Sequence, residues 1–122
     1  MTRPDKDDAR EERIHMEIIV DAYGPEEQAM GWYNYLDDTL RFPFIARCIV
    51  RRSTSPLEPG DEVEVMEMAP DEECEHEMFV SIRWKRRQLA VPLMQLEGIH
   101  VDKQTQQAIE DWHYWVKQGY EL

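Results

Sequence analysis

Carboxylate side chains dominate one stretch of the chain, EPGDEVEVMEMAPDEECEHE, at residues 58–77. Ten of these residues are Asp or Glu, and none is Lys or Arg. Like charges a few ångströms apart repel by on the order of 1 kcal/mol per pair in water, and by more near a protein surface. The segment is therefore either loose and solvated, or it is held together by a cation that lies among the carboxylates.

These carboxylates have the chemistry of ligands for a hard cation. Ca²⁺ takes about six to eight oxygen ligands from carboxylates, carbonyls and water, in flexible geometry. The densest group lies in APDEECEHEMF, and its alternate acids would point the same way if this loop is extended. A solvated surface without a bound ion is the simpler interpretation of an acidic run taken alone. The candidate ligands from this stretch are Glu62, Glu64, Asp71, Glu72, Glu73, Glu75 and Glu77.

A second pair of acids, Asp37 and Asp38, lies in the last turn of a predicted helix. The helix dipole makes this end negative, so an acid here costs roughly a few tenths of a kcal/mol or more. A bound cation would remove that cost, which makes both residues candidate metal ligands. At about 100° per residue, Asp37 leans toward the sheet and Asp38 faces away. Pairing with Arg41, one helical turn further on, is the alternative explanation.

Recognised metal and enzyme motifs are absent from the chain. No segment matches an EF-hand loop, so a calcium site must combine separate segments. Zinc is the rival metal, but Cys74 and His76 do not have the spacing of a zinc knuckle, and we expect Cys48 in the core and Cys74 in a loop. No Gly-rich phosphate loop, G-x-S-x-G or H-E-x-x-H occurs either. We therefore expect no enzymatic activity.

Hydrophobic spacing and turn residues predict the elements that position these acids. The second helix has a predicted core stripe, and the aromatic run DWHYW at 111–115 has the helical spacing of core residues. The predicted fold class is α+β, with a small, SH3-like, bent antiparallel sheet, two N-terminal helices and one C-terminal helix. Helical patterns cover residues 11–22, 25–40 and 102–118, strand patterns cover 44–50, 61–68, 78–84 and 88–91, and 92–99 form a short helical turn. The core stripe of the second helix is Ala29, Tyr33, Leu36 and Leu40.

Length, charge and apolar content restrict the class of protein. The 122 residues fit one domain, with residues 1–10 as a flexible N-terminus and 11–122 as the folded part. A net charge of −12 excludes a general phosphate-binding surface of the kind that nucleic acids need, so cations or basic surfaces are the expected partners. Apolar runs are too short to span a membrane, and the start lacks signal-peptide features. We expect a cytoplasmic monomer without nucleic-acid or membrane partners.

Four segments carry a likeness to a known family that covers residues 11–122: WYNYLDDTLRFPFIARC, GDEVEVMEMAPDEECEHEMFVSIRW, LAVPLMQLEGI and AIEDWHYWVKQGY. Taken together they resemble the CcbP-type calcium-binding proteins of cyanobacteria. The resemblance implies a small α/β protein that binds Ca²⁺ through surface carboxylates without EF-hands. It also implies an intracellular calcium buffer or sequestering protein, which in nitrogen-fixing filaments is associated with control of heterocyst differentiation.

The leading hypothesis is that residues 11–122 form one calcium-binding domain, which buffers, sequesters or signals through Ca²⁺. We expect Asp38 and one or more acids of residues 71–77 to form a tighter site, and Glu62 or Glu64 to contribute to a weaker one. The alternative is an acidic, SH3-like interaction module that docks a basic partner and binds metal incidentally.

Overall fold

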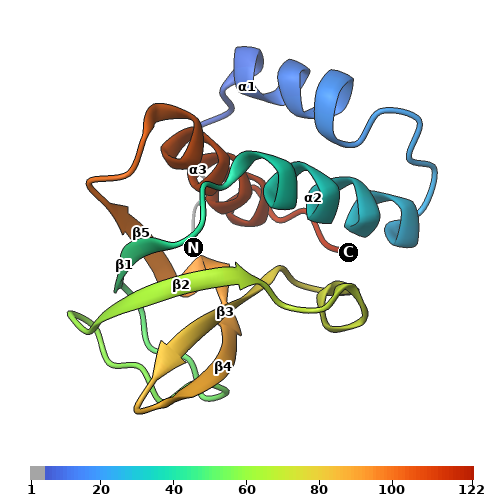
Figure 1. The fold of residues 1–122 in the computed structure, drawn as a ribbon. Coiled ribbons are helices and arrows are strands. Elements are labelled where there is room, and N and C mark those ends of the chain that lie inside the picture. The colour runs from blue at the N-terminus through green and yellow to red at the C-terminus, as the bar shows by residue number, and fades with distance from the viewer. Residues whose placement is uncertain (1–4) are drawn as a thin grey trace.

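The computed structural model describes residues 5–122, with three helices on one side of a sheet (Figure 1). The helical elements are α1 (Asp8–Arg13), the π-helical turn η1 (Ile14–Ile18), α2 (Pro25–Thr39), the 3₁₀ turns η2 (Asp71–Cys74) and η3 (Leu93–Gln95), and α3 (Lys103–Lys117). The strands are β1 (Phe44–Cys48), β2 (Glu62–Met68), β3 (Phe79–Trp84), β4 (Arg87–Pro92) and β5 (Leu96–Ile99). Within the described residues no helix is long and apolar enough to cross a membrane.

The sheet has five antiparallel strands in the order β4-β3-β2-β1-β5. Together with the two N-terminal helices and the C-terminal helix, this confirms the α+β prediction, whereas the likeness to an SH3 barrel stays a prediction. The helical turn expected at residues 92–99 is confirmed only for its first part, η3. Its second part is β5, a strand too short to show a periodic pattern.

A β-bulge in β2 decides where the last acid of that strand points. Val63 and Val65 are buried, so a strict alternation would direct Glu67 into the core as well. The register against β3 shifts between Val65 and Glu67. The bulge adds one residue to β2 at this point. Glu67 is therefore exposed and Met68 is buried, at the end of the strand that leads to the acidic loop.

Three tryptophans form the centre of the core between α2 and α3. Trp32, Trp112 and Trp115 are at most 2 % exposed, and their ring centroids are 5.1–5.6 Å apart. The two from α3 confirm the core prediction for DWHYW. The predicted core stripe of α2 is confirmed at Ala29, Leu36 and Leu40, which are buried, and Tyr33 is half-buried and packs against the core. The prediction missed Trp32, which is fully buried against the tryptophans of α3.

The N-terminal helix differs from its predicted bounds of 11–22. It begins at Asp8, because the Asp7 side chain caps it by accepting from the Arg10 N–H, and its helical turns end at Ile18. Close packing on α2 holds this end, since a Cβ added at Gly31 would lie 2.5 Å from the Ile18 carbonyl oxygen. The expected flexibility of residues 1–10 stays a prediction; residues 1–4 lie outside the described part of the chain.

A buried carboxylate ties the N-terminal helix to α3. Asp111 is fully buried and accepts bonds of 2.5 and 2.8 Å from the Arg13 guanidinium and of 2.7 Å from the Tyr35 hydroxyl, with Arg10 3.2 Å away. The carboxylate raises the pKa of Arg13 above its ordinary value, chiefly through this side-chain bond. Burial and the bond to Asp111 also raise the pKa of Tyr35.

We expect Asp111→Asn to lower the free energy of unfolding by about 3 kcal/mol, because it leaves the arginines without their buried counter-charge. Urea unfolding followed by circular dichroism measures this loss. Glu110→Gln is the matched control, since Glu110 is exposed and lies 3.5 Å from Arg10; it should cost less than about 0.5 kcal/mol. Equal losses for the two variants would contradict the structural role assigned to Asp111.

Candidate functional site

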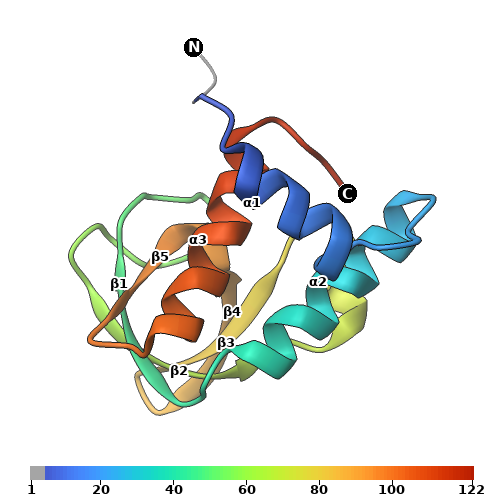
Figure 2. The same ribbon diagram turned by 90° about the horizontal axis from the view of Figure 1, so that it is seen from above.

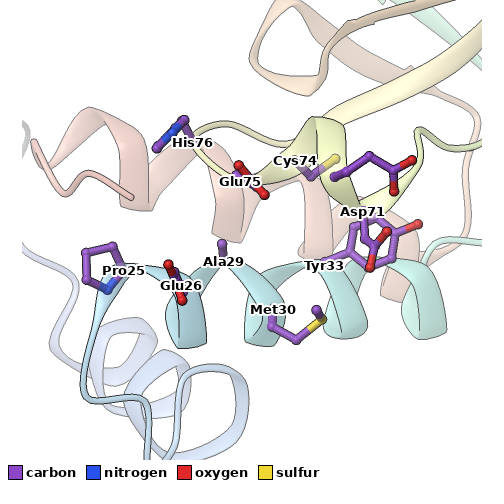
Figure 3. Close-up of a pocket in the computed structure, with 10 residues that line it drawn as sticks. Pro25, Glu26, Ala29, Met30, Tyr33, Asp71, Cys74, Glu75 and His76 are labelled. Atoms are coloured by element: carbon purple, nitrogen blue, oxygen red, sulfur yellow. The ribbon is translucent and has the colours of Figure 1, made fainter.

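An acidic cleft lies between the N-terminal half of α2 and the loop that carries η2. In both ribbon views this loop lies beside α2, at the end of the molecule where β2 and β3 meet it (Figures 1 and 2). The cleft has a volume of about 520 Å³. Figure 3 shows α2 forming one wall and the η2 loop the other. The lining residues are Pro25, Glu26, Ala29, Met30, Tyr33, Asp71, Glu72, Cys74, Glu75 and His76.

The loop is folded back by contacts at its two ends. The Tyr33 hydroxyl on α2 donates to the Ala69 carbonyl at 2.9 Å, just after β2 ends. The buried Cys74 thiol bonds to the backbone of Phe79, where β3 begins. Between these anchors the chain makes a 3₁₀ turn in which the Glu73 N–H donates to the Pro70 carbonyl. The acids of this loop are therefore presented from a turn and not from an extended segment.

This turn corrects one expectation from the sequence. Glu73, Glu75 and Glu77 do not share one face, because the extended geometry that would align them is absent. Cys74 lies in the loop as expected, where it is 1 % exposed, and its burial raises the pKa of the thiol. Cys48 is buried in the core as expected.

Arginine residues neutralise part of the acidic stretch 58–77. Glu77 receives two bonds from the Arg52 guanidinium, at 2.8 and 2.9 Å, which raise the pKa of Arg52. The other pairs lie at 3.4–3.6 Å on the outer surface: Glu58 with Arg51, Glu62 with Arg47, and Glu64 with Arg83. Three of the candidate ligands, Glu62, Glu64 and Glu77, are thus already paired and lie outside the lining of the cleft.

The acids around the cleft have no such partners. Among residues 5–122 no Lys or Arg forms an ion pair with the acids of residues 67–75 or with the acids of α2. The sequence reasoning did not identify Glu26, because an acid in the first turn of a helix is already explained by the helix dipole. The unpaired acids are Glu26, Asp37, Asp38, Glu67, Asp71, Glu72, Glu73 and Glu75.

Tyr33 identifies which of these charges lie close together. Its pKa is raised first by partial burial, and then by negative charges that include those of Asp37, Asp71 and Glu67. These acids come from α2, η2 and β2, so the fold brings three separate segments to one hydroxyl. Asp37 and Asp38 are both exposed, but Asp37 lies four residues after Tyr33 and therefore on the same face of α2. Asp38 is turned about 100° further round the helix.

The donor atoms of the cleft fit a hard cation, but the site is open. Four of its lining residues carry carboxylates, which calcium prefers. The Cys74 thiol, the softest donor in the lining, is buried and bonded to the backbone of Phe79. Within the described residues no three His, Cys, Asp or Glu side chains converge closely enough to hold a metal ion. An ion could therefore be held only after carboxylates from the two walls move toward it.

Comparisons with known proteins agree with this donor chemistry. The CcbP family model, described as calcium binding, matches residues 12–116. The crystal structure of Anabaena CcbP is 44 % identical, with 100 % of both chains covered and a TM-score of 0.88. A calcium-binding protein solved in its calcium-binding form is 45 % identical, with 96 % of both chains covered and a TM-score of 0.85. No curated protein sequence matches the chain.

We expect Asp37→Asn and Asp71→Asn each to lower the pKa of Tyr33, because each removes a negative charge that disfavours the phenolate. Asp38→Asn is the matched control, with the same change one residue away, and should lower this pKa less, because its side chain points about 100° further round the helix. Titration of tyrosine ring signals by NMR measures the three values without calcium. The same shift in all three variants would contradict the placement of Asp37.

Proposed function

The chain belongs to the CcbP family of calcium-binding proteins, and from this premise we propose that it binds Ca²⁺ in the acidic cleft between α2 and η2. The observation that carries this proposal is the set of unpaired carboxylates on both walls of the cleft. These carboxylates repel one another when no ion is bound, which raises the free energy of the ion-free protein. A divalent cation removes this repulsion when it binds, and its affinity rises accordingly.

We assign the ligands according to their position and pairing. Asp71, Glu72 and Glu75 from the loop and Glu26 from α2 line the cleft. Asp37 lies near the cleft, since its charge raises the pKa of Tyr33, which is one of the lining residues. Asp38 and Glu73 do not line the cleft, so we expect them to add long-range attraction more than direct ligation.

The arginine pairs argue against a second site on the outer face of the sheet. A calcium ion at Glu62 or Glu64 would first have to displace Arg47 or Arg83, which are already 3.4 Å from these carboxylates. At Glu77 it would have to break a two-bond pair with Arg52. Binding energy would be lost at each of these positions before any ligand bond formed.

The open site suits reversible storage of calcium. Because carboxylates must move to surround the ion, we place its affinity in the range of about 10⁻⁷ to 10⁻⁵ M that flexible acidic loops reach. Ions would be taken up when calcium rises and released when it falls. We therefore propose an intracellular buffering or sequestering role, with no catalytic step.

Calorimetric titration of two variants tests the assignment of the ligands. Asp71→Asn should weaken calcium binding by at least about tenfold, or about 1.4 kcal/mol, because it removes a ligand. Glu64→Gln removes the same charge from the same acidic stretch but from an arginine-paired residue, and should change the affinity less than about twofold. Similar small losses in both variants would indicate that calcium is attracted by the acidic surface as a whole, and would contradict the proposed site.

Metal selectivity is a second test. Mg²⁺ demands near-ideal octahedral geometry and gives up its water reluctantly, so this open cleft should bind it at least about tenfold more weakly than Ca²⁺. Titration with each ion at the same ionic strength measures the ratio. Equal affinities would mean that the ions are attracted only as counterions.

A further inference from the structure

The acidic cleft also has an apolar side that calcium binding does not need. Pro25, Ala29 and Met30 line it on α2, with the ring of Tyr33 beside them (Figure 3). Met30 is 46 % exposed, although the chain buries most of its large apolar side chains. An ion needs oxygen atoms, and it gains nothing from an exposed thioether. Flexible methionines on a surface are typical of protein-binding sites, because they adapt to varied apolar partners.

The charges at the rim specify the kind of partner. Glu26 lies on the α2 wall, and Asp71, Glu72 and Glu75 lie on the opposite wall, all without a Lys or Arg partner among residues 5–122. Such a cleft concentrates a negative potential and attracts positive groups. A second copy of this chain is disfavoured, because each carries a net charge of −12. An acidic segment is disfavoured for the same reason.

We propose that this cleft docks a cationic segment of a partner protein, with one apolar side chain seated over Met30 and flanking Lys or Arg residues paired with the rim acids. The apolar contact supplies affinity that charge alone does not, and the flanking charges fix the orientation of the segment. The volume of about 520 Å³ admits a few residues and not a whole domain face.

Calcium and this segment compete for the same carboxylates, a step that rests on the proposed function. An ion held by Glu26, Asp71, Glu72 and Glu75 occupies the same carboxylates that would pair with the Lys or Arg groups of the segment. By linkage, each ligand weakens the other by the same factor. A rise in calcium then releases the partner.

A synthetic peptide with one leucine between pairs of lysines is the probe, and calorimetry with NMR shift mapping is the measurement. Two reference peptides have the leucine replaced by serine or the lysines replaced by glutamates. The leucine–lysine peptide should bind at least about fivefold tighter than the serine peptide, the gain expected from one modest apolar contact. The glutamate peptide should not bind. Equal binding of the leucine and serine peptides, or binding of the glutamate peptide, would overturn the proposal.

Two methionine variants distinguish peptide binding in the cleft from non-specific apolar binding elsewhere on the surface. Met30→Ala should abolish the difference between the leucine and serine peptides and leave calcium affinity unchanged, because it removes the apolar contact and adds no oxygen donor. Met16→Ala is the matched control, because Met16 is 66 % exposed on η1 and does not line the cleft. It should keep the full difference. The same loss in both variants, or no loss in Met30→Ala, would contradict docking at Met30.

Competition between calcium and the peptide shows which of the two proposals fails, the calcium site or the docking surface. Saturating Ca²⁺ should weaken the leucine–lysine peptide at least about tenfold if the two share carboxylates. If the protein does not bind calcium but binds the peptide in a way that depends on Met30, the proposed function is refuted and the docking surface is still supported. Calcium binding that leaves peptide affinity unchanged would overturn the competition.

Discussion

The pairing of arginine with carboxylate decides where the negative charge of this protein is concentrated. Acids are spread along residues 58–77, but Arg47, Arg52 and Arg83 neutralise several of them on the outer surface and at the end of the loop. Among the acids of this stretch that have no arginine partner, Asp71, Glu72 and Glu75 line one cleft. Net charge therefore matters less here than the positions of the few cations, because interactions between exposed charges fade within about 8 Å at physiological salt.

The acidic loop keeps its position through contacts that involve few of its own charges. Tyr33 bonds to Ala69 before the loop, the Cys74 thiol bonds to Phe79 after it, and Arg52 pairs with Glu77. These anchors let the carboxylates between them stay exposed and mobile without unfolding the turn. A rigid frame combined with free side chains fits a site that must close around an ion and open again.

The cleft is open, yet the chain belongs to a calcium-binding family. The two facts agree if the ligands come together only when the ion binds. No three potential ligands converge among the described residues, whereas a relative of 45 % identity is known in a calcium-binding form. Bringing carboxylates together without an ion costs repulsion, so a site of this kind is expected to assemble only when the ion is present. The same openness leaves Met30 and the rim acids accessible to a cationic segment.

The sequence by itself determined the features that depend on neighbours along the chain. Alternation placed Val63 and Val65 inside, Asp102 capped the last helix through the Thr105 N–H, and Gly119 ended it. Only the tertiary structure decided which acids act together. Glu64 and Asp71 look equivalent in the sequence, but the arginine that neutralises Glu64 comes from a neighbouring strand. Asp71 lies across the cleft from α2, and its charge acts on Tyr33 together with that of Asp37. Coulomb energy depends on distance in space, and no local pattern encodes the distance between segments that the fold brings together.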